Sequence, residues 1–123
     1  MKTGKIVEEF GDIFMEAVWD SSILQMEMIL SGKMKSQEAQ ILNKKINKLS
    51  GDDKKLVKEI IAETIRRSIF NVLNFFDGEE NYFIGFDNGE KIINIKELSD
   101  GLAGELYGEN GWIKRYSKNE IRK

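Results

Sequence analysis

The stretch DDKKLVKEIIAETIRRSIFNVLNFFD (residues 52–77), followed directly by GEENYFIGFDNGEKIINI (residues 78–95), decides the fold of this chain. Apolar residues recur at every third or fourth position of the first segment, which predicts one long amphipathic helix. Ser50 and Asp53 resemble a capping box at its start, and Gly78 stands where a C-terminal cap belongs. The apolar face of the helix comprises Leu56, Val57, Ile60, Ile61, Ile65, Val72, Leu73 and Phe76.

In the second segment the period of the apolar residues changes to 2, which predicts β-strands. Asn88-Gly89 is the preferred pair for a type I′ turn, so we expect a hairpin with these two residues as its loop. The expected register pairs Phe86 with Lys91, Ile84 with Ile93, and Tyr82 with Ile95. Because a lone hairpin is marginally stable in water, this one must pack on the helices or gain a third strand.

The residues before this region predict further helices. An apolar stripe that begins near Lys5 predicts a first helix, and the pattern blurs at Asp20. It either continues there as one helix or restarts with Asp20 as an N-cap, and Gly32 marks its end. Ser36 opens a second, more polar helix that ends at 50–51.

After the hairpin, Ser99 reads as the N-cap of a short helix that ends at Gly108. Residues 112–116 read as a third short strand. The predicted fold is therefore α+β, with N-terminal helices packed on a small antiparallel sheet made of the hairpin and that third strand. We expect residues 1–123 to form a single domain, since domains of roughly 100–150 residues are the commonest.

The chain contains no histidine and no cysteine. It therefore lacks the side chain that titrates near neutral pH and any Ser–His or Cys–His nucleophile pair. The usual ligand sets for zinc, haem and iron–sulfur clusters are missing as well. The acidic run 77–81 lacks the ligand spacing of a calcium-binding EF-hand loop. We expect a protein that is not an enzyme and that holds no metal and no cofactor.

The N-terminal residues do not resemble a secretory signal, because no apolar run of about 7–15 residues follows Met1. No stretch approaches the roughly 18 apolar residues that a membrane-spanning helix needs. The absence of cysteine fits a reducing compartment. We therefore expect a cytoplasmic protein that makes no contact with membranes.

Charge is segregated along the chain. Residues 33–58 carry eight lysines against three acids, whereas residues 77–109 carry two lysines against nine acids. The acidic block either meets a basic partner or forms solvated faces whose charge is balanced within the molecule. The lysine-rich block lacks arginine and interleaved aromatic residues, and the net charge is −2, so nucleic acid is not an expected partner.

The most unusual segment is SDGLAGELYGENGW, residues 99–112, which holds four glycines and three acids. One interpretation is a recognition surface on which Tyr107 and Trp112 are anchors, since Tyr and Trp are enriched among interface hot spots. The other is a short helix packed closely through Gly101 and Gly104, with Trp112 in the core. Both interpretations remain open from the sequence.

Two stretches carry a resemblance to a class of proteins: Leu49-Ser50-Gly51-Asp52-Asp53-Lys54 at the start of the long helix, and the run from Ser99 to Trp112 with Arg115-Tyr116-Ser117 after it. With the helix-rich N-terminal half and the hairpin, they resemble small bacterial proteins grouped with toxin-immunity families, over residues 50–117. The resemblance implies an inhibitor that binds one cognate toxin and performs no chemistry of its own. It implies no particular contact residues.

We therefore expect a protein-binding module, most concretely an immunity or antitoxin-like inhibitor that blocks a basic toxin domain through an acidic surface. A second hypothesis is a homo-oligomeric assembly protein that dimerises through its helices, with Met26, Met28 and Met34 at the contact. A third is a carboxylate-based hydrolase, which would need two acids facing each other across a pocket. The expected partner-binding residues are Glu79, Glu80, Asp100, Glu105, Tyr107, Glu109 and Trp112.

Overall fold

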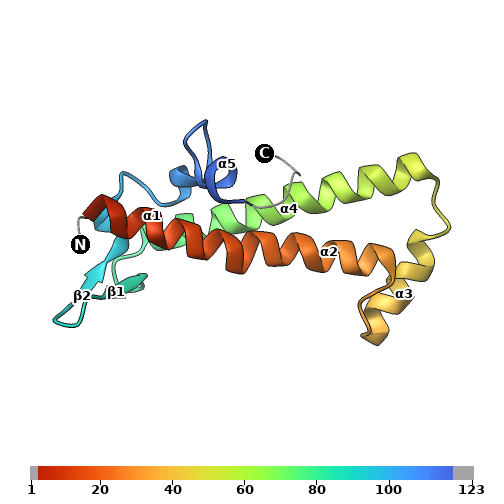
Figure 1. The fold of residues 1–123 in the computed structure, drawn as a ribbon, viewed down its shortest axis with the longest axis horizontal. Helices are drawn as coiled ribbons and strands as arrows, with labels where there is room; N and C mark the ends of the chain where they lie inside the picture. The colour runs from red at the N-terminus through yellow and green to blue at the C-terminus, as the bar shows by residue number, and fades with distance from the viewer. Residues whose placement is uncertain (1–2, 118–123) are drawn as a thin grey trace.

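The computed structural model describes residues 3–117 and is dominated by helices (Figure 1). The helices come first in the chain and a two-stranded antiparallel sheet follows, which confirms the α+β class. In chain order the elements are α1 (Thr3–Phe14), the π-helical segment η1 (Met15–Asp20), α2 (Ser21–Ser31), α3 (Gln37–Ile46), α4 (Gly51–Gly78), β1 (Gly85–Asp87), β2 (Ile92–Asn94), the 3-10 helices η2 (Ile95–Leu98) and η3 (Ala103–Leu106), and α5 (Trp112–Tyr116).

The first 29 described residues form one continuous rod, so the pattern that blurs at Asp20 continues rather than restarts. Asp20 has helical dihedrals, φ −63° and ψ −38°, and does not cap a new helix. The rod passes through η1, whose wider turn keeps side chains four residues apart on one face. Met15, Trp19 and Ile23 are accordingly all buried. Gly32 ends the rod as predicted, with φ 79°.

Two serines start the next helices as predicted. The Ser36 hydroxyl accepts a hydrogen bond from the Ala39 amide at the start of α3, and the Ser50 hydroxyl accepts one from the Asp53 amide at the start of α4. The amide of Asn43 donates to the carbonyls of Ile29 and Leu30 at 3.2 and 3.0 Å. Asn43 thereby satisfies C-terminal carbonyls of α2 and holds α3 against it.

The hairpin forms, but its predicted register is wrong. Phe86 pairs with Ile93 and not with Lys91, so the loop between the paired residues is longer than Asn88-Gly89. The reason is local: the Asn88 side-chain oxygen accepts hydrogen bonds from the Glu90 and Lys91 amides at 2.9 and 3.0 Å, which builds an Asx turn. The slip is two residues, so the apolar residues of both strands still share one face.

The expected third strand is wrong, because residues 112–116 form the helix α5. The Arg115 amide donates to the Gly111 carbonyl at 3.0 Å, which closes a helical turn that a strand pattern over five residues does not reveal. The expected helix after Ser99 is reduced to the 3-10 turn η3. The Ser99 hydroxyl accepts from the Gly101 amide at 3.1 Å and so caps a tight turn instead.

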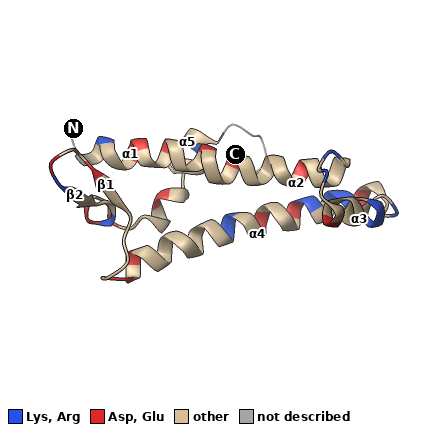
Figure 2. Ribbon diagram, turned by 90° about the horizontal axis from the view of Figure 1, so that it is seen from below, with Lys and Arg blue, Asp and Glu red and all other residues tan. Residues whose placement is uncertain are grey.

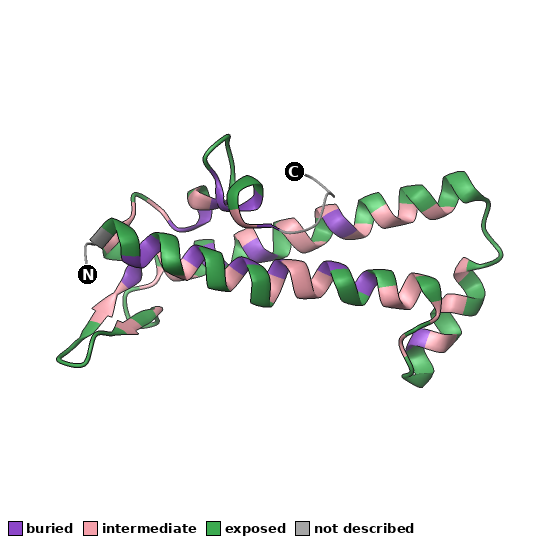
Figure 3. Ribbon diagram, in the orientation of Figure 1, coloured by how far each residue is buried: buried purple, intermediate pink, exposed green. Residues whose placement is uncertain are grey.

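The first rod and α4 form a pair of long helices, and the C-terminal segment, residues 95–117, packs on one side of this helix pair (Figures 1 and 3). The hydrophobic core lies beneath the segment. Trp19 and Trp112 are both 0% exposed. The Trp19 indole donates to the Ser117 hydroxyl at 2.9 Å, and that hydroxyl donates to the Asp20 carboxylate at 3.0 Å. This buried chain of bonds ties the end of the described chain to η1.

The opposite end of the molecule, with α3 and the neighbouring parts of α2 and α4, is mostly exposed or half-buried (Figure 3). None of the helices within residues 3–117 combines the length and apolar character that a membrane crossing requires.

Candidate functional site

The predicted partner-binding residues lie on two segments: Glu79 and Glu80 follow the C-terminus of α4, and the others lie between residues 100 and 112, after the hairpin. Glu80, Asp100, Tyr107 and Glu109 are exposed, and Glu79 and Glu105 are half-buried. Trp112 is the exception, because it is fully buried.

Asp77 joins the two segments that carry the predicted acids. Its carboxylate accepts hydrogen bonds from the backbone amides of Leu102 and Ala103, at 2.9 and 3.0 Å. These amides begin η3, so the negative charge of Asp77 stands where a helical turn exposes its donors. This clasp brings the stretch with Asp100 and Glu105 to the end of α4, where Glu79 and Glu80 follow. Sequence reasoning missed the clasp, because the two amides lie 25 and 26 residues after Asp77 in the chain.

Lys96 donates hydrogen bonds to backbone carbonyls at the same end of α4 and offsets their partial negative charge. Its ammonium donates to the backbone carbonyl of Glu79, and to that of Asp77 at 3.5 Å. A cation is favourable at the negative end of a helix dipole, whereas acids there are unfavourable. Glu79 and Glu80 follow α4 directly, and its last turn holds no basic residue. These acids therefore oppose local helix stability.

Asp100 and Glu105 form the second part of the acidic surface. Partial burial raises the pKa of the Glu105 carboxyl above its usual value, Arg115 opposes this shift, and the nearby charges of Asp100 and Glu8 add to it. The Arg115 guanidinium also lies 3.6 Å from the Glu8 carboxylate. Part of the negative charge at Glu105 is therefore balanced within the molecule, as the second interpretation of the charge pattern expects.

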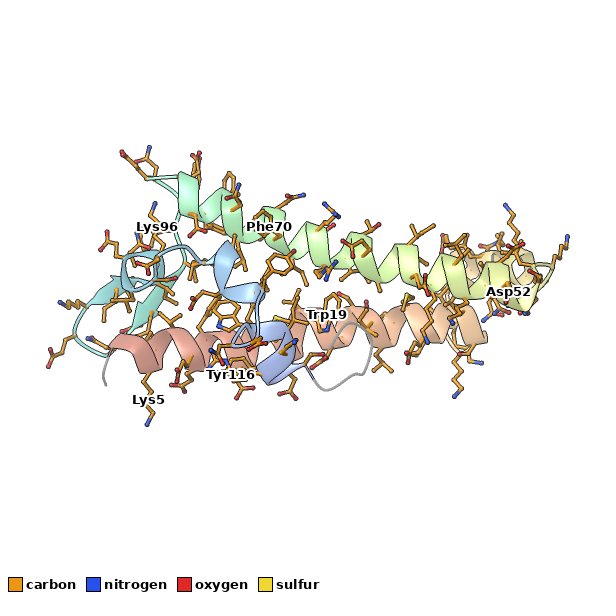
Figure 4. All side chains as sticks on the ribbon, turned by 90° about the horizontal axis from the view of Figure 1, so that it is seen from above. Lys5, Trp19, Asp52, Phe70, Lys96 and Tyr116 are labelled. Atoms are coloured by element: carbon orange, nitrogen blue, oxygen red, sulfur yellow. The ribbon has the colours of Figure 1, made fainter. Side chains whose placement is uncertain are left out.

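Tyr107 lies between the core and the surface. Its ring centroid is 5.8 Å from that of Phe70, and the Arg66 guanidinium is 5.7 Å from the Tyr107 ring. The residue nevertheless keeps 41% of its surface exposed. The contact of Tyr107, which directly follows η3, with Phe70 thus helps to hold η3 against α4, and part of the tyrosine stays exposed. Figure 4 labels Phe70 on α4.

Trp112 belongs to the core, which removes it from the list of candidate anchors. Its ring stands edge-on to Phe10 at 5.7 Å and lies 6.3 Å from Phe14. A Cβ at Gly11 would lie only 2.4 Å from the indole, so α1 carries a glycine where the tryptophan crosses it. The close packing expected at Gly101 and Gly104 is wrong: nothing lies within 4 Å of a Cβ built at Gly104.

Sequence reasoning missed an exposed aromatic pair that adjoins the acids. Phe75 in the last turns of α4 and Tyr82 after it are 50% and 63% exposed, and their ring centroids are 6.2 Å apart. The prediction placed Tyr82 opposite Ile95 on the packed face of the hairpin, and the changed register leaves it outside the sheet. Phe75 and Tyr82 flank Glu79 and Glu80 in the sequence. Large exposed aromatic side chains at a charged rim are typical of protein-binding surfaces.

A second apolar contact covers the outer face of the hairpin. Phe83 and Ile92 are 47% and 57% exposed, and a Cβ at Gly85 would meet both side chains, at 3.3 and 2.6 Å. The glycine therefore lets the two side chains close over the strand. Side chains alternate between the two faces of a strand, so the sequence predicts that Phe83 faces away from Ile84. This alternation is the sequence feature that indicates the exposure of Phe83.

The described residues contain no cluster of three or more metal-ligating side chains. Comparisons of the chain with protein-family models, with curated proteins and with solved structures gave no match.

Proposed function

We propose that this chain is a non-enzymatic protein-binding module, most concretely an immunity or antitoxin-like inhibitor of a basic toxin domain. The observation that carries the proposal is the exposed pair Phe75 and Tyr82, in ring contact beside Glu79 and Glu80 at the end of α4. Residues of this type supply most of the binding energy where proteins meet.

The acids near the pair support a partner of positive charge. Glu79 and Glu80 lie between Phe75 and Tyr82 in the sequence, and the Asp77 clasp brings the segment of Asp100 and Glu105 to the end of α4. Like charges gathered at one end attract an opposite surface over a distance and raise the rate of encounter at low salt. A partner with a basic, apolar-centred surface fits this end, and an inhibitor that covers such a surface needs no catalytic residue.

The partner is identified by capture. The tagged chain is used to isolate its partner from the host, and the captured protein is identified by mass spectrometry and expressed alone. We expect one stoichiometric partner that is toxic by itself and harmless when the chain is present. Capture of no stoichiometric partner, or of one that is harmless alone, contradicts the inhibitor proposal.

Binding of this partner to variants then tests the surface. The double substitution Phe75→Ser/Tyr82→Ser is expected to weaken binding about tenfold or more. Truncation of an aromatic anchor that a complex buries costs more than about 1 kcal/mol. Glu79→Lys/Glu80→Lys and Glu105→Lys/Glu109→Lys are expected to slow association and to reduce its dependence on salt. Glu59→Lys, an exposed charge reversal in the N-terminal half of α4, is the control. Unchanged affinity and salt dependence in all three double variants would refute this surface.

A further inference from the structure

An uncharged groove runs between the first rod, residues 3–31, and α4, away from the acidic end. Two adjoining cavities of about 310 and 370 Å³ share Ser22 and Ile65 and together make the groove. None of the described residues that line it carries a charge. They are Phe14, Val18, Ser22, Gln25, Met26, Ile29 and Leu30 of the first rod, Leu42 of α3, and Ile61, Thr64, Ile65, Ser68, Ile69 and Val72 of α4.

The groove lies on the face of the helix pair that the C-terminal segment leaves uncovered. Leu42 of α3 lines the groove, so the groove lies on the side of the helix pair where α3 is found. Phe70 and Arg66 of α4 face Tyr107, on the side that the C-terminal segment covers. Figure 1 shows α3 and the hairpin projecting from the groove side at opposite ends of the helix pair, and Figure 2 views the molecule from that side. The groove face is therefore a saddle, raised at both ends and apolar along its floor.

We propose that a second copy of this chain occupies the groove, with the helix pairs of the two copies crossed. A saddle fits a copy of itself turned by about a right angle, and a two-fold axis relates the two. An uncharged floor also meets its own copy without like-charge repulsion. Val72 on the floor is 50% exposed in the single chain, and Leu42 is 48% exposed. A second copy would bury both.

Charge favours one of the two possible crossings. In that crossing the α3 of each copy lies along the outer side of the first rod of its partner. Lys44 and Lys45 of α3 are exposed, and so are Glu9 and Glu16 of the first rod. Figure 2 shows the blue α3 at one end and the red outer side of α1. The opposite crossing would instead place the hairpin, with Asp87 and Glu90, against those acids.

This inference does not depend on the proposed inhibitor role, because its residues lie outside the acidic end. It also assigns a specific contact surface to the second hypothesis from the sequence, a dimer that forms through the helices. Among the methionines of that hypothesis, Met26 is buried and lines the groove, whereas Met28 and Met34 are half-buried and do not.

Sedimentation equilibrium of the full chain at several concentrations tests the proposal. We expect a reversible dimer, and Ser68→Glu and Val72→Glu are each expected to raise its dissociation constant about tenfold or more, because a charge would be buried in the contact. Asn71→Glu is the matched control: it adds the same charge to an exposed position of the same helix, outside the groove. A monomer at all concentrations overturns the proposal, and so does a dimer that Ser68→Glu leaves intact.

A charge exchange tests the crossing itself. Lys44→Glu/Lys45→Glu and Glu9→Lys/Glu16→Lys are each expected to weaken the dimer, since both copies then present like charges. A mixture of the two variants restores opposite charge at both contacts, so we expect a heterodimer at least as strong as the unmodified dimer. Circular dichroism verifies that each variant is folded. A mixture that stays as weak as its components overturns the crossed arrangement.

Discussion

At the scale of single residues, Gly11 decides how the C-terminal segment meets the first rod. The indole of Trp112 occupies the space that a Cβ at Gly11 would take, at distances of 2.4 to 2.8 Å. Trp112 is fully buried and Gly11 is buried with it. A glycine in a helix ordinarily lowers stability, so its presence here follows from the close approach of the ring.

Gly11→Ala is expected to destabilise the protein. The methyl group forces the indole or the helix to move, which costs about 1–3 kcal/mol by overpacking, and the helix propensity of alanine offsets about 1 kcal/mol of that cost. Urea denaturation followed by tryptophan fluorescence measures the change. Gly4→Ala in the same helix is the matched control, since nothing lies within 4 Å of its Cβ position, and it is expected to leave stability unchanged or slightly raised. Equal effects at both positions would contradict the packing argument.

Glu105 gives a pH dependence with a definite sign. Its pKa is raised in the folded protein, chiefly by partial burial, so the folded chain binds a proton at Glu105 more readily than the unfolded chain. Ionisation of Glu105 therefore costs stability above the raised pKa, and the cost disappears as the pH falls below the ordinary pKa of a glutamate.

Glu105→Gln removes this cost, because glutamine stays neutral. We expect a higher urea midpoint than that of the unmodified protein at neutral pH, and a difference that shrinks as the pH is lowered through the acid range. Midpoints measured at several pH values check this. A difference that does not vary with pH would show that packing, and not the charge of Glu105, is responsible.

At the scale of elements, the junction of α4, η2 and η3 depends on two charged side chains. Asp77 accepts from two backbone amides of the later segment, and Lys96 donates to two carbonyls at the end of α4. Both bind backbone groups at helix ends, which have no partner within their own helix. The order of this loop-rich region therefore rests on charge-assisted hydrogen bonds as well as on burial of Leu102 and Leu106.

Asp77→Asn is expected to loosen this junction. An asparagine keeps one acceptor oxygen and turns an NH₂ group toward the second amide, so one bond is lost and two donors face each other. The cost is about 1–3 kcal/mol. Hydrogen exchange at the Leu102 and Ala103 amides is expected to accelerate. Glu80→Gln, which neutralises an exposed acid nearby, serves as the control, and slow exchange at both amides in Asp77→Asn would refute the clasp.

At the scale of the whole molecule, charge and apolar surface are separated in space. Acids lie along α1, at the end of α4 and in the hairpin region, whereas lysines gather around α3 (Figure 2). The uncharged groove runs between the first rod and α4. The two proposals therefore rest on surfaces of different chemistry: exposed aromatic rings with acids near them in one case, and an uncharged groove in the other. The two surfaces are tested by different variants, so either proposal can fail without the other.

Local pattern in the sequence determined the α+β class, the long helix α4, its serine cap, the cap at Ser36 and the stop at Gly32. These features depend on residues within a turn or two of one another, where helical period and capping chemistry act. The hairpin was predictable as an element for the same reason. Its register was not, because the side chain of Asn88 competes with the backbone pairing that a two-residue turn requires.

Tertiary structure decided the rest. Residues 112–116 form a helix whose first residue, Trp112, packs its ring against Gly11, 101 positions earlier in the chain. The Asp77 clasp, the exposure of Phe75 and Tyr82, and the groove between the rods likewise arise from residues distant in sequence. Periodicity records which side chains share a face, but only packing determines which of those faces are covered and which remain exposed.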